Sequence, residues 1–131
     1  MKLPFKEYNA NPKNKRTCDC VIRALTIATG LKYEAVYKEL FDISLKTGYM
    51  LNEKRVEDKF LEAHGFIKMK QPRKNDNTKY TINEIRLICK DDVIVIRCAH
   101  HLTCVKTGVL IDTWNCGYKT INNYYVLGGA K

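Results

Sequence analysis

The sequence has no long apolar run. None of its hydrophobic stretches approaches the ~20 residues that a membrane-spanning helix requires, and no apolar segment follows the charges of residues 1–6. A secretory signal places a hydrophobic segment directly after its charges. We therefore expect a protein of the cytoplasm that has no membrane partner.

Cysteine pairs with the spacing of a zinc ligand or a redox motif are also missing. The chain has six cysteines, and no two of them form a C-x-x-C pair. Without a secretory signal, we expect these thiols to be reduced. One denser group of metal-type side chains comprises Cys98, His100, His101 and Cys104. Alternation along a strand would send them to opposite faces, so we predict no metal site and no cofactor.

Internal repeats and interdomain linkers are absent from the sequence too. With 131 residues, of which 45% are hydrophobic, the chain has the size and the apolar content of one globular unit. We therefore predict a single domain over residues 1–131.

Basic residues outnumber acidic ones, 23 to 14, which gives a net charge of +9. This excess is compatible with an acidic protein partner, with nucleic acid or with a merely solvated surface. The densest basic segments are residues 13–16 and 68–79. Neither contains the aromatic residues of a platform that binds single-stranded nucleic acid. The sequence therefore does not favour nucleic acid as the partner.

Apolar residues recur at helical spacing in the first two thirds of the chain. The pattern predicts helices over residues 20–29, 33–46, 53–64 and 82–88. The first of these is apolar over most of its surface, which predicts a central buried helix, and Thr17 or Asp19 is placed to cap it. Residues 1–16 predict a loop or short extended arm, and residues 68–79 an exposed loop.

From Asp91 the pattern becomes that of strands. Strands are predicted over residues 93–96, 102–106, 109–113 and 121–127. Thr107-Gly108 is the turn signal of a hairpin between the second and the third of these strands. Helices followed by an antiparallel sheet are typical of an α+β domain, in which N-terminal helices pack on a C-terminal sheet.

Cys20 begins the predicted central helix. A thiol in the first helical turn lies at the positive end of the helix dipole, which lowers its pKa and favours the nucleophilic thiolate. A free cysteine is also a common small core residue. A nearby base and an orienting group would distinguish the two interpretations.

The predicted hairpin supplies both groups. A two-residue turn at positions 107–108 places Thr103 opposite Asp112 and His101 opposite Trp114, with all four side chains on one face. His101 and Asp112 are then diagonal neighbours within reach of an imidazole–carboxylate hydrogen bond. Such a bond fixes the tautomer and stabilises the imidazolium, and Trp114 would shield it from water.

An alternative pair lies on the opposite face of the same hairpin. A slip of one residue in register exchanges the two faces of a strand, and on that other face His100 lies opposite Asn115. Cysteine–histidine–asparagine triads also exist. His100 with Asn115 is therefore the alternative to His101 with Asp112, which the geometry favours.

The order of a helix-opening cysteine, a strand histidine and an acid on the next strand resembles the minimal core of the papain-like cysteine peptidase fold. Members of that fold include small bacterial peptidases that trim double-glycine bacteriocin leaders. Four segments are also similar to a group of small uncharacterised proteins of bacteria and their phages: Thr17–Ala24, Tyr33–Tyr37, His101–Thr103 and Asp112–Gly117.

This resemblance implies roles for individual residues. Cys20 would be the nucleophile, His101 the base and Asp112 the orienting acid. Papain relatives carry an amide side chain six residues before the nucleophile, which implies that Asn14 donates to the oxyanion together with the Cys20 backbone N–H. Cys18, two residues before Cys20, departs from the family pattern and would be an auxiliary thiol that either competes for oxidation or marks a redox-sensitive site.

The resemblance implies a cysteine-dependent hydrolase (a peptidase, isopeptidase or amidase) or an acyltransferase. It would act on a protein or peptide in the cytoplasm of a bacterial host cell. The alternative is a non-catalytic binding or inhibitor protein of phage origin, whose basic surface engages an acidic host protein or a nucleic-acid complex. A Cys20→Ser variant would lose the first function and keep the second.

Overall fold

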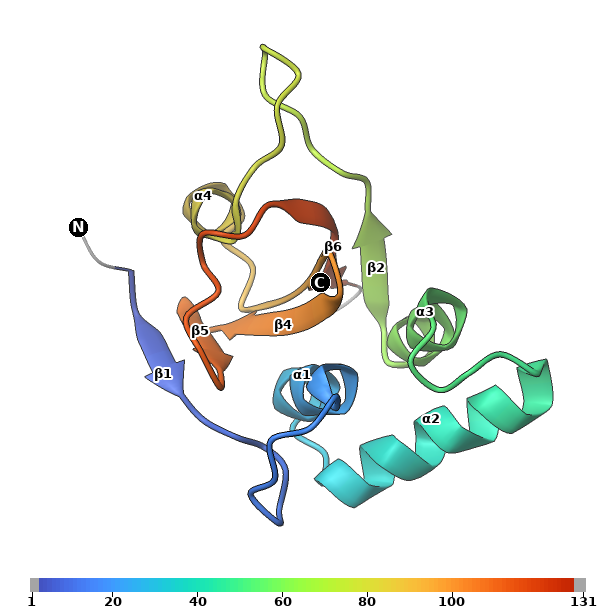
Figure 1. Cartoon of the computed structure of the whole chain (residues 1–131). Helices are drawn as coiled ribbons and strands as arrows, with labels where there is room; N and C mark the ends of the chain where they lie inside the picture. Colours follow the sequence, from blue (N-terminus) through green and yellow to red (C-terminus); the bar gives the residue numbers. More distant parts are fainter. Residues whose placement is uncertain (1–2, 129–131) are drawn as a thin grey trace.

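A six-stranded sheet separates two layers of helices in the computed structural model, which describes residues 3–128 (Figure 1). On one face, α1 (Cys20–Thr29) packs against the sheet beside α3 (Lys54–Ala63), and α2 (Tyr33–Thr47) crosses both helices from outside. The short α4 (Ile82–Ile88) belongs to the apolar core of the other face. Residues 1–2 of the predicted N-terminal arm and residues 129–131 of the predicted domain lie outside the described residues.

The order of the strands in the sheet is β1-β5-β4-β3-β6-β2. Their bounds are β1 Phe5–Glu7, β2 Phe66–Met69, β3 Val93–Cys98, β4 His101–Lys106, β5 Val109–Asp112 and β6 Ile121–Leu127. The α+β class, with N-terminal helices and a C-terminal sheet, is confirmed. No helix in the described part of the chain is both long and apolar enough to cross a membrane.

The prediction of a purely antiparallel sheet is wrong at one edge, where β1 pairs with β5 in parallel. The loop predicted from residue 68 is also wrong at its start, because β2 continues to Met69 and pairs with β6. Both strands are short, and their partners lie far away in the sequence. Such strands show little periodicity of their own, so sequence patterns fail to reveal them.

Helix α1 is the buried centre of the larger core, as predicted. Leu25 has no exposed surface, and Ala24 is nearly as buried. Asp19 occupies the position before the helix, but its carboxylate makes no capping hydrogen bond. The carboxylate is instead engaged by the Arg23 guanidinium, whose Nε lies 2.8 Å from Oδ1. The first turn of α1 is therefore fixed by an ion pair rather than by a conventional cap.

The β4–β5 hairpin has the predicted register, in which Lys106 pairs with Val109 and Cys104 with Ile111. Both residues of its turn have positive φ, 52° at Thr107 and 78° at Gly108, as in a type I′ turn. This register aligns the start of β4 with the end of β5.

Thr107→Asn should stabilise the protein by about 0.5–1 kcal/mol, because a β-branched residue is strained at positive φ whereas asparagine tolerates it. Gly108→Ala should destabilise it by about 1 kcal/mol. The added methyl group would meet no atom within 4 Å, so its effect comes from the backbone alone. Urea unfolding measures both changes, and effects of equal sign would contradict this turn geometry.

Candidate active site

Cys20 is the first residue of α1, and His101 is the first residue of β4. Because α1 packs along β4, the two side chains come together where these elements begin. Burial raises the pKa of the Cys20 thiol. Hydrogen bonding to His101 and to the Leu102 backbone, with the positive charges of His101 and Arg23, outweighs burial and lowers that pKa below its usual value. The site therefore favours the thiolate.

His101 is held by Asp112, with 2.7 Å between Nε2 of the ring and Oδ2 of the carboxylate. Burial lowers the pKa of His101, but hydrogen bonds to Asp112, Cys116 and Cys20 raise it to about 11. Burial raises the pKa of Asp112, but its bonds to His101 and Thr103 lower it to about 2. The pair is therefore charged at neutral pH. Since Asp112 occupies Nε2, Nδ1 is the nitrogen left for Cys20.

Asp112 is the centre of a buried hydrogen-bond network. Its Oδ2 also accepts from the Thr103 hydroxyl at 2.6 Å and lies 3.6 Å from the Cys116 thiol. Its Oδ1 accepts from the Thr113 backbone N–H at 2.6 Å and from Arg23 at 3.1 Å. Both oxygens are thus satisfied, which offsets the cost of burying a carboxylate.

Arg23 lies one helical turn after Cys20 and was not identified from the sequence as a site residue. Its guanidinium bridges Asp19 on one side and Asp112 on the other, and the side chain is buried. A charged residue inside a helix that is apolar over most of its surface was the available signal, because a buried arginine needs a carboxylate partner.

Two further residues contact His101. The Trp114 ring lies with its centroid 5.4 Å from the centroid of the imidazole, tilted by 51°, and covers one side of it as the sequence suggested. Cys116 was not expected near the site, yet its sulfur lies within 4.8 Å of ligand atoms of both His101 and Asp112. These three groups could hold a metal ion, but hydrogen bonds already join them.

The other predicted residues occupy different places. His100 is exposed in the turn between β3 and β4, with φ of 57°. Asn115 lies beyond the end of β5, where its Oδ1 accepts from the Gly117 N–H at 3.2 Å; among the described residues, no hydrogen bond joins it to His100. Asn14 is exposed in the loop before α1, with φ of 52°.

The cysteines other than Cys20 lie in different parts of the fold. Cys98 and Cys104, from the denser group of metal-type side chains, belong to the cores on opposite faces of the sheet. Cys18 is exposed and lines the same cavity as Cys20. All six cysteines lie within the described residues, and all are free thiols.

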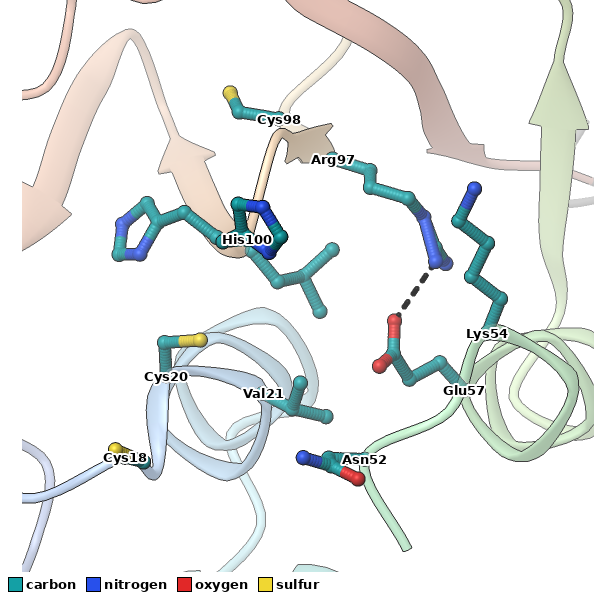
Figure 2. A pocket seen from close by; sticks show the side chains of 11 residues that line it. Cys18, Cys20, Val21, Asn52, Lys54, Glu57, Arg97, Cys98 and His100 are labelled. Atoms are coloured by element: carbon teal, nitrogen blue, oxygen red, sulfur yellow. Dashed lines mark ion pairs between the residues drawn. The ribbon is translucent and has the colours of Figure 1, made fainter. Parts of the chain in front are cut away.

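A cavity of about 350 Å³ opens beside Cys20, between the start of α1, helix α3 and the β3–β4 turn (Figure 2). Its lining residues are Cys18, Cys20, Val21, Asn52, Lys54, Glu57, Arg97, Cys98, His100, His101 and Leu102. Cys20 and His101 thus share one cavity, and Asn14 is not among the described residues that line it.

Comparisons of the chain with protein-family models, with curated proteins and with solved structures gave no match.

The His101–Asp112 pair should make stability depend on pH in both directions. The pKa of His101 is raised from 6.5 to about 11, so its contribution is complete below pH 6.5 and is lost as the pH rises towards 11. The pKa of Asp112 is lowered from 3.8 to about 2, so its contribution is lost as the pH falls from 3.8 towards 2.

Asp112→Asn removes the charge of this pair with little change of shape. Relative to this variant, the parent should lose about 2 kcal/mol of unfolding free energy between neutral pH and pH 10. Urea unfolding of both proteins across pH measures the difference. Parallel stability curves would contradict the ion pair.

Proposed function

We propose that the protein is a cysteine-dependent hydrolase that cleaves a peptide, isopeptide or other amide bond. Cys20 is its nucleophile, His101 its base and Asp112 its orienting acid. The observation that carries this proposal is that a helix-opening thiol with a lowered pKa meets an imidazole held at 2.7 Å by a buried carboxylate. Covalent catalysis by a thiol requires a nucleophile beside a base, and an orienting group that holds the base from its other side.

In the first half of the reaction, the Cys20 thiolate attacks the carbonyl carbon of the substrate and forms an S–C bond. The oxyanion accepts a hydrogen bond from the Cys20 backbone N–H, which belongs to the first helical turn and has no partner within the helix. Imidazolium His101 then donates its Nδ1 proton to the leaving nitrogen. The C–N bond breaks, the amine departs and a thioester remains.

In the second half, water attacks the thioester while neutral His101 accepts one of its protons. The S–C bond breaks, the carboxylic acid leaves, and the thiolate–imidazolium pair is restored. An amine in place of water would give acyl transfer from the same intermediate, so transamidation is a second outcome of this site. The resemblance to papain-like peptidases favours a protein or peptide substrate, and the resemblance to small proteins of bacteria and phages favours a bacterial cytoplasm.

An electrophilic thiol probe at neutral pH should label Cys20 before the other cysteines. Cys18 provides an internal control, because it is exposed whereas Cys20 is half-buried. Labelling governed by access alone would favour Cys18, and labelling governed by thiolate character favours Cys20. Mass spectrometry of the digested protein over time measures both rates.

His101→Ala should slow the labelling of Cys20 by roughly tenfold or more, because it removes the group that stabilises the thiolate. The labelling of Cys18 should stay unchanged, which shows that the effect is specific to Cys20. Equal rates at Cys18 and Cys20 in the parent protein, or an unchanged Cys20 rate in the variant, would overturn the proposed function.

A further inference from the structure

The cavity beside Cys20 has an apolar part and a charged part. Val21 and Leu102 are its buried apolar residues. Figure 2 shows Cys20 on one side and, across the cavity, Arg97 from β3 with Lys54 and Glu57 from α3. Because Cys20 lines this cavity, the substrate side chain that fills the cavity belongs to a residue close to the carbonyl that the thiolate attacks.

Arg97 is the fixed positive charge of the cavity. It is 5% exposed, and its Nη1 forms an ion pair of 3.0 Å with Oε1 of Glu57. Within residues 3–128 its Nε has no hydrogen-bond partner. Asp58 also contacts the guanidinium, but it does not line the cavity and is itself paired with Lys68 at 2.9 Å. A buried donor without a partner is costly, so additional negative charge near the guanidinium would be favourable.

Lys54 adds a second positive charge to the same wall, where Glu57 is the one carboxylate among the described residues that line the cavity. Burial raises the pKa of Glu57 to about 7, although Arg97 and Lys54 act against it and Asp58 adds to it. Near neutral pH, Glu57 therefore takes up a proton at little cost. Once protonated it no longer repels an anion and instead donates a hydrogen bond.

We infer that this cavity is a subsite for an acidic side chain, glutamate or aspartate, adjacent to the carbonyl that Cys20 attacks. The inference rests on the proposed function and narrows its substrate class to acidic peptides. A lysine or arginine side chain would face Arg97 and Lys54 as like charges. A neutral amide would gain hydrogen bonds but no attraction to the two cations.

Peptidyl electrophiles that differ only in the residue before the reactive group test this inference. Probes with glutamate, glutamine or lysine at that position should label Cys20 at different rates, with glutamate about tenfold faster than its isostere glutamine, because hydrogen bonds to charged groups are the stronger ones. The lysine probe should be the slowest. The rates are measured by mass spectrometry of the digested protein.

Lys54→Gln should slow the glutamate probe by about two- to fivefold, the effect of one exposed charge, and leave the glutamine probe unchanged. Lys59→Gln is the matched control, because Lys59 is exposed on the same helix but does not line the cavity. Glu57→Gln should act in the opposite direction: it keeps an acceptor for Arg97, removes the opposing charge and accelerates the glutamate probe above pH 7.

The labelling rates distinguish a failure of the proposed function from a failure of the acidic subsite. Equal labelling of Cys18 and Cys20 by every probe would overturn the proposed function. Preferential labelling of Cys20 at equal rates by the glutamate and glutamine probes, or fastest by the lysine probe, would keep the proposed function and overturn the acidic subsite. An equal loss of rate in Lys59→Gln and Lys54→Gln would also overturn it, because net charge alone would then explain the effect.

Discussion

A buried ion pair between Arg23 and Asp112 joins the helix that begins at Cys20 to the hairpin that begins at His101. An unpaired charge in the core costs several kcal/mol, so each partner stabilises the buried charge of the other. Asp19 completes the arrangement from the other side of the guanidinium. The Cys20 thiol and the His101 imidazole are therefore brought together with the help of the ion pairs that Arg23 forms with Asp112 and Asp19. Helix α1 is oriented against the sheet by these charges as well as by apolar packing.

The turn at Thr107-Gly108 is the second constraint. Its positive φ values set the two-residue register of β4 and β5, and the register decides which side chains reach Asp112. The end of β5 is also held by the residue after β1, because the Tyr8 N–H donates to the Asp112 carbonyl at 2.8 Å. Asp112 thus receives backbone and side-chain hydrogen bonds from several elements, which fixes the position of the carboxylate that holds His101.

Local features of the sequence predicted the helices, the hairpin and the hydrogen bond between His101 and Asp112. Each depends on a period or on a turn signal that a few neighbouring residues carry. The strands β1 and β2, the role of Arg23 and the position of Cys116 depend on partners far away in the chain. The cavity combines residues from α1, α3 and the β3–β4 turn, so no single stretch could reveal it. The parallel pairing of β1 could not be predicted either, because its partner β5 lies far away in the chain.

Asp112 lies at the centre of the core network and also holds the His101 ring, and this double use bears on how such a protein can evolve. Active sites commonly hold strained or poorly compensated groups, so that gains in stability come with losses in activity. Here both oxygens of Asp112 are satisfied. Substitutions that tighten this network would strengthen fold and site together, which leaves the cavity wall around Lys54 and Asn52 free to vary with the substrate.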